Sequence, residues 1–187
     1  MPSQDQNEES DLVAKISSGN KNAFEVLFKK YYAELVRFAF HITNSFQASE
    51  DIVQDVFVNV WEFRSNLKAE KSIKIYLYRS VKNRALNFLK HKKFENFAEG
   101  LDDFENDMPE FDPELNLYHA ELEKMVNWGI KQLHEKCRLI FLLHRQNGLT
   151  YQEIAQILDI SVKTVEIQIG KVLKTLTLRK LLTPYIH

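Results

Sequence analysis

Apolar residues recur at steps of three and four along most of the chain, a pattern that predicts α-helices. A long helix is expected from about Asn22 to Ile42, and another from about Ala48 to Phe63, where a broad apolar stripe lies beside an acidic edge. A short helix is expected from Asp11 to Ser18, capped by Ser10. Glycine and proline are scarce, so the predicted fold class is all-α.

A polar loop, Ser65 to Lys71, precedes a basic amphipathic helix from about Ser72 to His91. Its inward face is expected to hold Ile73, Leu77, Val81, Leu86 and Leu89. Its outward face is expected to hold Lys74, Tyr78, Arg79, Lys82, Asn83, Asn87 and Lys90. Cations beside phosphates and planar groups beside bases suit single-stranded nucleic acid. Alternatively, the lysines only solubilise the helix and Tyr76 and Tyr78 belong to the core.

The helical periodicity is lost between Phe94 and Pro113, a segment that is acidic, contains two prolines and lacks Lys and Arg. Such a composition is typical of a linker. Helices are expected again from about Pro113 to Leu133 and from about Glu135 to Gln146. The chain is therefore predicted to form two helical domains joined by an acidic linker.

The stretch from Leu149 to Leu173 has the form of a helix-turn-helix. Gly148 suits the left-handed position that closes the preceding helix. Thr150 and Glu153 have the spacing of a capping box, and Ser161 can cap the second helix. The expected inward-facing residues are Ile154, Ala155 and Leu158 in the first helix and Val162, Val165, Ile169 and Leu173 in the second.

The outward face of the second helix is polar and cationic. Side chains of this kind reach base edges and phosphates when a helix lies in the major groove. The alternative is a solvated face on a small helical subdomain. The expected DNA-facing residues are Lys163, Thr164, Ile167, Gln168, Lys171 and Lys174.

The net charge of −1 conceals a block pattern. Residues 63–93 hold ten Lys and Arg against one acidic residue, and residues 131–180 hold nine against four. Between them, residues 94–130 hold eleven acidic residues against one Lys. Two basic blocks separated by an acidic one predict two contacts with a polyanion.

Several function classes are not expected. The single Cys137 excludes an internal disulfide and fits a reducing compartment. The polar start has no signal-peptide pattern, and no apolar run approaches the ~20 residues that span a bilayer, so a cytoplasmic protein without membrane insertion is expected. His134, Cys137 and His144 match no closed metal site, and no catalytic constellation is visible. We expect no metal, no cofactor and no enzymatic activity.

Three segments in order, ASEDIVQDVFVNVWEF, SIKIYLYRSVKNRALNFL and CRLIFLLHRQNGLTYQEIAQILDISVKTVE, carry a family resemblance. Over roughly residues 10–180 the chain resembles the extracytoplasmic-function (ECF, group 4) sigma-70 factors of bacterial RNA polymerase. It looks closest to those abundant in Bacteroidetes. The resemblance implies a region 2 domain over 10–92, an acidic linker over 93–113 and a region 4 domain over 114–182.

The resemblance also implies partners. In the family, region 2 binds the β′ clamp helices of core RNA polymerase, the β flap is a further part of the polymerase that is bound, and the linker threads toward the active-site cleft and the RNA exit path. The resemblance also implies an anti-sigma factor as a further partner. The polymerase-binding residues implied here are Glu50, Asp51, Gln54, Asp55 and Phe57.

Promoter contacts follow from the same resemblance. The −10 element would be opened and held by Asn66, Lys68, Lys71, Lys74, Tyr76, Tyr78, Arg79, Lys82, Asn83, Asn87 and Lys90, with Asn83 matching the family's base-contacting Asn. The −35 element would be read by Thr150, Ser161, Lys163, Thr164, Ile167, Gln168, Lys171 and Lys174.

The chain departs from the family pattern at several positions. Tyr76 stands where Trp is frequent, Glu166 where Arg occurs, and Gly170 where a larger DNA-facing side chain is common. Asp159 replaces a Gly in the turn, where Asp tolerates the left-handed conformation better than most residues.

Two other function classes fit parts of the sequence. A conventional regulator with a response-regulator-type helix-turn-helix would also suit the SVKTVE motif, but it would need a sensory or receiver domain before Gln132. Residues 22–91 show no βα alternation for such a domain. A nucleic-acid enzyme that uses these modules for docking would need a ligand set that the sequence does not show.

Overall fold

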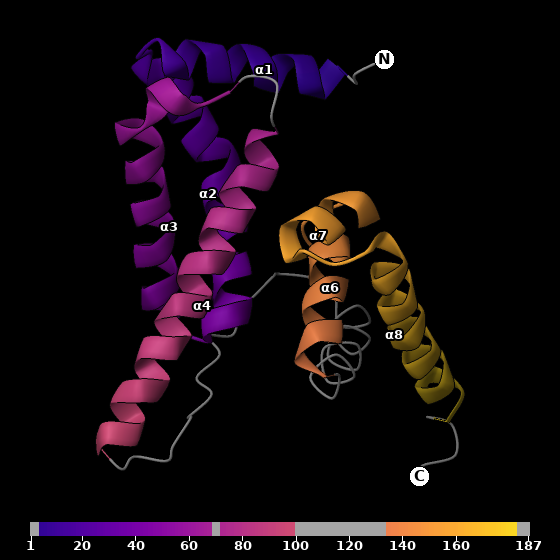
Figure 1. Ribbon diagram of the computed structural model, residues 1–187. Coiled ribbons are helices and arrows are strands. Elements are labelled where there is room, and N and C mark those ends of the chain that lie inside the picture. Colours follow the sequence, from indigo (N-terminus) through magenta and orange to yellow (C-terminus); the bar gives the residue numbers. More distant parts are fainter. Residues whose placement is uncertain (1–3, 69–71, 100–133, 183–187) are drawn as a thin grey trace, which may run out of the picture. The chain divides into compact units, whose positions relative to one another are not determined.

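The computed structural model describes residues 4–68, 72–99 and 134–182, and the regular secondary structure of this part is helical (Figure 1). This confirms the predicted all-α class. The chain divides into two units, residues 1–108 and 109–187. Each unit is described below by itself.

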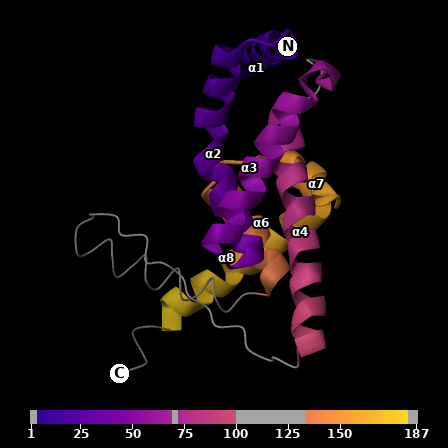
Figure 2. The same cartoon turned by 90° about the vertical axis from the view of Figure 1, so that its left-hand side faces the viewer.

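The first unit is a helical bundle. It comprises α1 (Gln4–Ser17), α2 (Lys21–Thr43), α3 (Phe46–Glu62), the short 3₁₀ helix η1 (Arg64–Asn66) and α4 (Ile73–Glu99). The helices α2, α3 and α4 pack against one another, and α1 crosses one end of the bundle beside η1 (Figures 1 and 2).

Side-chain caps fix the helix boundaries of this unit. Asn20 Oδ1 accepts a hydrogen bond from the Ala23 amide at 3.0 Å and so begins α2. Asn44 ends α2 in the left-handed conformation (φ 53°), and Ser45 Oγ caps α3. The boundaries predicted for α2 and α3 are therefore confirmed within about two residues.

Two predicted boundaries are wrong. The first helix begins at Gln4, so Ser10 lies inside it and is not its cap. The helix α4 continues to Glu99 and covers the first residues of the predicted linker. Helix-forming residues such as Glu95, Ala98 and Glu99 allow this extension, which an apolar-periodicity argument does not detect.

The core of the first unit is rich in aromatic rings. Phe24 and Phe28 of α2 pack against Phe57 of α3, with ring centroids 6.1 and 4.8 Å apart. Phe38 packs against Tyr78 of α4 at 5.1 Å. Such pairs add to the burial of large apolar areas, so they join the three long helices into one core. The other fully buried large side chains include Leu27, Leu35, Val53 and Leu77.

A partly buried hydrogen bond joins α1 to α2. The Tyr31 hydroxyl donates to the Glu9 carboxylate, and Lys30 Nζ lies 2.9 Å from the same carboxylate. Burial, followed by the hydrogen bond to Glu9, raises the pKa of Tyr31 far above its ordinary value. Tyr31 therefore remains a neutral hydrogen-bond donor, and the charge of the Glu9 carboxylate is paired with Lys30.

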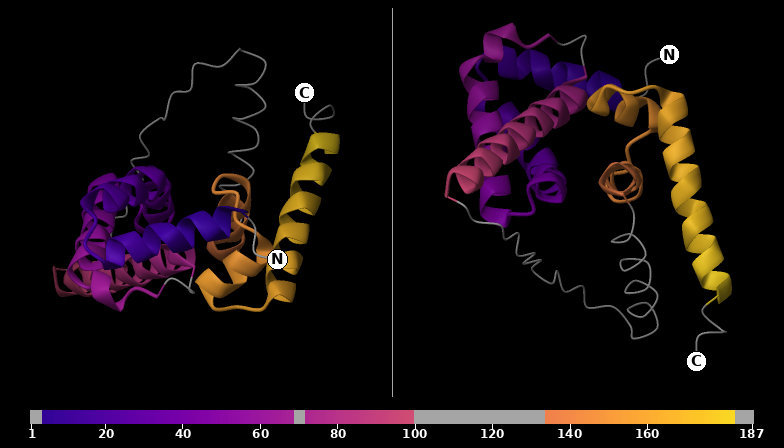
Figure 3. Two further views of the ribbon diagram at one scale, coloured as in Figure 1. Left: turned by 90° about the horizontal axis from the view of Figure 1, so that it is seen from above. Right: turned by 60° about the horizontal axis from the view of Figure 1, so that its bottom comes forward.

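The second unit contains α6 (Glu135–Arg145), α7 (Tyr151–Leu158) and α8 (Val162–Leu182). Both α6 and α7 pack against α8, and a short turn joins α7 to α8 (Figure 3). Gly148 (φ 61°) and Asp159 (φ 59°) close α6 and α7 in the left-handed conformation. The predicted helix-turn-helix is therefore confirmed, including the turn at Asp159.

Parts of the predicted inward-facing set of this unit are wrong. In α7, Ile157 is fully buried and Leu158 only partly so. In α8, Val172 is fully buried, whereas Leu173 is exposed and Val162 is at the edge of the packed face. Near the C-terminal end of the described side chains of α8, the face that packs on α6 and α7 therefore contains Val172 in place of Leu173.

The predicted capping box is present at the start of α7. The Thr150 amide donates to Glu153 Oε2 at 2.8 Å, and the Glu153 amide donates to Thr150 Oγ1 at 3.2 Å. We expect Thr150→Ala to destabilise α7 by about 1 kcal/mol, since one helix-end amide loses its acceptor. Amide hydrogen exchange in α7 should then become about fivefold faster.

The control for this prediction is Gln152→Ala, an exposed change in the same helix turn that leaves the capping box intact. Exchange rates in α7 should stay near those of the unchanged protein. Equal exchange in Thr150→Ala and Gln152→Ala would contradict a stabilising role for the box.

Candidate nucleic-acid interface

The acidic edge of α3 is exposed and only lightly paired. Asp51 and Gln54 face solvent, and Gln47 Nε2 donates to Asp51 Oδ1 at 3.2 Å. Glu50 is partly buried and lies 3.5 Å from the Tyr32 hydroxyl. Asp51 and Gln54 are therefore free to meet a partner without first breaking a buried contact.

Phe57 does not belong to this exposed edge. Its side chain is 2% exposed and packs against Phe24 and Phe28, which contradicts its prediction as a polymerase-contacting residue. The exposed apolar residue is instead Val58, one helical turn after Gln54. Sequence reasoning missed Val58. The signal was its spacing, because a residue four positions after Gln54 lies on the same face of the helix.

The basic face of α4 is present, but Tyr78 is not part of it. Tyr78 is fully buried and its hydroxyl lies 3.3 Å from Glu34 Oε2, so the prediction that it faces outward is wrong. Tyr76 is 44% exposed. The inward-facing set is also corrected, because Ala85 is buried and Leu86 is exposed.

The other predicted −10 residues are accessible to different degrees. Exposed side chains are those of Asn66, Lys68, Arg79, Asn83, Asn87 and Lys90, and partly buried ones are those of Lys74 and Lys82. Lys71 lies outside the described residues. The structure thus brings one planar ring, several cations and several amides onto one helix and the segment that precedes it.

Arg84 connects the acidic edge with the basic helix, a role that sequence reasoning missed. Its Nη1 lies 2.9 Å from Asp55 Oδ2, so an ion pair joins α4 to α3. Both side chains are substantially exposed, which makes the pair a modest contribution to stability. Of the acidic edge, Asp55 is therefore the residue that is already engaged by a cation.

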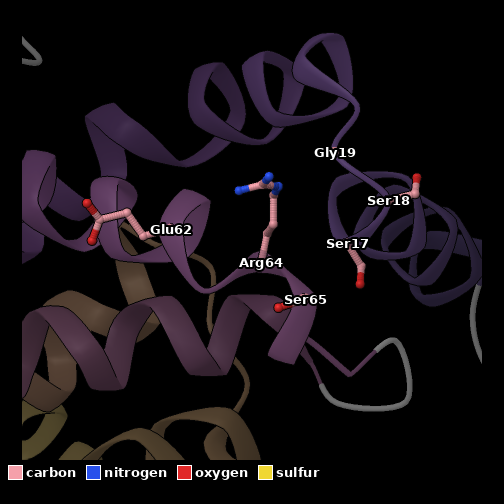
Figure 4. A pocket seen from close by; sticks show the side chains of 6 residues that line it. All are labelled: Ser17, Ser18, Gly19, Glu62, Arg64 and Ser65. Carbon is pink, nitrogen blue, oxygen red and sulfur yellow. The ribbon is translucent and has the colours of Figure 1, made fainter.

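A surface pocket of about 200 Å³ lies where α1 ends and η1 begins (Figure 4). The Arg64 side chain extends into it, donates to the Trp61 carbonyl at 2.8 Å and covers the Trp61 ring at 4.6 Å. A cation near the carbonyl end of a helix is stabilised by the helix dipole. Arg64 therefore stabilises the C-terminal end of α3. This structural role explains why its side chain lies in the pocket, and no ligand is needed to explain it.

In the second unit, α8 presents the predicted cationic face. Lys163, Lys171 and Lys174 are exposed, and Ile167 is 48% exposed between them. A Cβ added at Gly170 would meet no atom within 4 Å, so that position leaves open space on the same face. This face can approach a polyanion closely.

The two predicted contacts at helix starts serve as caps. Ser161 Oγ accepts from the Thr164 amide at 3.1 Å, and the two hydroxyl oxygens lie 2.8 Å apart. Thr150 belongs to the capping box of α7. All of these caps are at the surface, where helix N-termini favour phosphate groups.

Gln168 differs from its neighbours on α8. Its side chain is partly buried, and Cys137 Sγ of α6 lies 2.7 Å from its Oε1. Gln168 is therefore less accessible than the lysines of this face, and its predicted contact with DNA stays a prediction. The hydrogen bond from Cys137 of α6 holds the Gln168 amide at the edge of the cationic face of α8.

Within the described ranges, no cluster of three His, Cys, Asp or Glu side chains is arranged to hold a metal ion. None of the helices in the described part of the chain combines the length and apolar content that crossing a bilayer requires.

The first unit has a basic face on α4, and the second unit has a helix-turn-helix whose second helix is cationic, two surfaces that are typical of a DNA-binding protein. A model of sigma-70 region 2 matches residues 27–95, and a model of sigma-70 region 4 matches residues 130–176. The two models together match more than half of the chain. The chain belongs to the sigma-70 family and is an RNA polymerase sigma factor of the ECF type.

Curated relatives cover nearly the same length. The chain is 28% identical over 172 residues to the RNA polymerase sigma-H factor of Pseudomonas aeruginosa, covering 88% of this chain and 89% of that protein. It is 27% identical over 172 residues to the ECF RNA polymerase sigma-E factor of Escherichia coli K12, covering 84% and 86% respectively.

Solved structures share the fold. CnrH in complex with the cytosolic domain of CnrY matches with a TM-score of 0.64 at 22% identity, covering 94% of this chain and 98% of that one. The sigma factor RpoE of Bartonella quintana, in complex with the anti-sigma factor NepR, matches with a TM-score of 0.64 at 17% identity. It covers 82% of this chain and 93% of that one.

Proposed function

We propose that this sigma factor binds core RNA polymerase through its first unit and opens the −10 element there, while its second unit reads the −35 element. The observation that carries the proposal is that each of the two folded units has a basic face, and that α3 of the first unit also has an exposed acidic edge. The protein then acts as a promoter-specificity factor and is not itself an enzyme.

The polymerase contact is assigned to the exposed edge of α3. Asp51 and Gln54 carry it, with Glu50 and Asp55 at its sides and Val58 continuing it by one turn. An exposed acidic helix edge suits a basic partner surface, because complementary charge steers association. In the same proposal, the second unit binds the β flap and the acidic linker occupies a basic polymerase channel.

The −10 contact is assigned to α4 and the residues before it. Tyr76 provides an exposed ring on which an unpaired base can stack, which is worth about 1–3 kcal/mol per base. Asn83 and Asn87 supply amides for base edges, and Arg79 and Lys90 supply cations for phosphates. This division of roles suits a melted strand rather than a duplex.

The −35 contact is assigned to the outward face of α8 in a major groove. Lys163, Lys171 and Lys174 would contact phosphates or guanine edges, and Ile167 would contact a thymine methyl group. The exposed starts of α7 and α8, at Thr150 and Ser161, would approach phosphates of the same duplex.

The proposal also includes a regulatory partner and a cellular compartment. We infer that an anti-sigma factor, often membrane-bound in this family, covers the basic faces of both units. The protein would act in the cytoplasm, where core polymerase is found. The assignment to the branch abundant in Bacteroidetes is also a proposal, supported by the three sequence segments that carry the resemblance.

The first experiment is a reconstitution. Purified protein is added to sigma-free core polymerase with genomic DNA of the host, and transcript starts are sequenced. We expect discrete starts that share upstream −10 and −35 elements. Absence of a complex with core polymerase, together with duplex binding by the protein alone, would instead favour a conventional helix-turn-helix regulator.

The helical fold of the first unit does not favour a conventional regulator of this kind. A response-regulator output protein needs a receiver domain with alternating strands and helices before its helix-turn-helix. The described residues of the first unit form helices only, and most of them lie within the match to sigma-70 region 2.

A further inference from the structure

A contact between α6 and α8 reaches a residue of the −35-reading helix. Cys137 packs beside the buried cluster of Phe141, Leu142 and Val172, which fixes the position of its thiol. The thiol sulfur lies 2.7 Å from Gln168 Oε1, one helical turn before Val172 on α8. Gln168 remains partly exposed, so one side of its amide faces α6 and the other faces solvent.

The chemistry of the pair determines which amide atom faces outward. A thiol is a donor and an amide oxygen is an acceptor, so the Cys137 S–H points at Oε1. The Nε2 group of Gln168 is then on the outward side, with two N–H donors. Without this contact, the amide could turn over and present its oxygen instead.

The surroundings of Gln168 identify the group that would accept these donors. On α8, Thr164 lies four residues before Gln168, and Lys171 and Thr175 follow at three and seven residues. These positions form one flank of the helix, and Lys171 adds a cation to it beside Gln168. The opposite flank carries Val162, Glu166 and Leu173, which are apolar or acidic.

A phosphate oxygen accepts hydrogen bonds and donates none, so it matches the two outward N–H donors of Gln168 and the neighbouring Lys171 cation. We propose that Cys137 is a positioning residue that turns the Gln168 amide so that Nε2 donates to a backbone phosphate of the −35 duplex. The contact fixes the register of α8 on the DNA and does not read a base. This inference rests on the proposed −35 role of α8 and adds to it an uncharged phosphate contact held from another helix.

The test uses reconstituted holoenzyme and promoter fragments with single methylphosphonate substitutions along the −35 element. Gln168→Leu and Cys137→Val are each expected to weaken binding about threefold to tenfold, the range of one neutral hydrogen bond. The loss should be equal for all −35 sequences. Cys137→Ser should bind like the unchanged protein, since a hydroxyl also donates to Oε1.

The methylphosphonates locate the contact. Neutralising the contacted phosphate should weaken binding by the unchanged protein and by Cys137→Ser. The same substitution should have little further effect on Gln168→Leu or Cys137→Val. The double variant should bind no more weakly than Gln168→Leu alone, because both changes remove one interaction. Thermal unfolding of each variant checks that the packing around Phe141 and Val172 is kept.

Several outcomes would overturn the inference. Binding by Cys137→Val equal to that of the unchanged protein would do so, as would a Gln168→Leu loss that depends on the base sequence. If the same methylphosphonate substitutions weakened binding equally in the unchanged protein and in every variant, the inference would also be overturned. The proposed recognition of the −35 element by α8 would then still stand. Holoenzyme that initiates without any −35 dependence would contradict the proposed function of α8, and this inference with it.

Discussion

Replacing Asp51 and Gln54 together by Ala is expected to weaken binding to core RNA polymerase at least about tenfold, since a hydrogen bond to a charged group contributes roughly 1.5–3 kcal/mol. Both side chains are exposed on α3, and Asp51 accepts a hydrogen bond of 3.2 Å from the exposed Gln47 side chain. The change therefore removes partner contacts without leaving a buried polar group unpaired. Binding is measured by titrating labelled sigma factor with core polymerase.

The control removes an equivalent charge from another helix. Glu25 on α2 is exposed and pairs with Lys29 at 2.6 Å, so Glu25→Ala changes the net charge as Asp51→Ala does. We expect its polymerase affinity to match that of the unchanged protein. Asp55 is unsuitable for this test, because its loss would also release Arg84. Equal polymerase affinity in the Asp51/Gln54 double variant and the unchanged protein would falsify the assignment of this edge.

Tyr78→Ala is expected to destabilise the first unit by about 3–5 kcal/mol, the usual cost of truncating a buried aromatic ring. The ring is fully buried, packs on Phe38 and carries a hydroxyl 3.3 Å from Glu34. Tyr78→Phe keeps the packing and loses only the hydroxyl contact, so a cost of about 1 kcal/mol is expected. Urea unfolding followed by circular dichroism measures both changes.

Tyr76→Ala is the matched change at an exposed position two residues earlier. We expect its stability to stay within about 0.5 kcal/mol of the unchanged protein. Promoter opening by the holoenzyme should instead fall about fivefold to a hundredfold, because a base loses its stacking surface. Permanganate footprinting of the −10 region reports this opening. A stable Tyr78→Ala protein with impaired opening would reverse the roles assigned to the two tyrosines.

The elements of the fold were largely predictable because their determinants are local. Apolar steps of three and four define α2 and α3, and the capping residues Asn20 and Ser45 lie within four residues of the amides they bind. The capping box of α7 and the turn at Asp159 are equally local. Local signals fix where a helix begins and ends, so the sequence located the helix-turn-helix correctly.

The faces of the helices were predicted less well. Periodicity shows that a helix has an apolar face, but the centre of that face depends on which helices pack against it. In α4, both Tyr76 and Tyr78 are near the edge of the apolar stripe, and the position of α2 decides that Tyr78 is buried. The same reasoning applies to Ala85 and Leu86, and to Val172 and Leu173 in α8.

By itself, the sequence determined the helical class, the charge blocks and the helix-turn-helix, because composition and contacts within one or two helical turns are sufficient for these features. Only the tertiary structure decided the partners of Asp55 and Gln168. Arg84 lies 29 residues from Asp55, and Cys137 lies 31 residues from Gln168. Contacts over such separations form only when different helices pack together, so no local pattern in the chain encodes them.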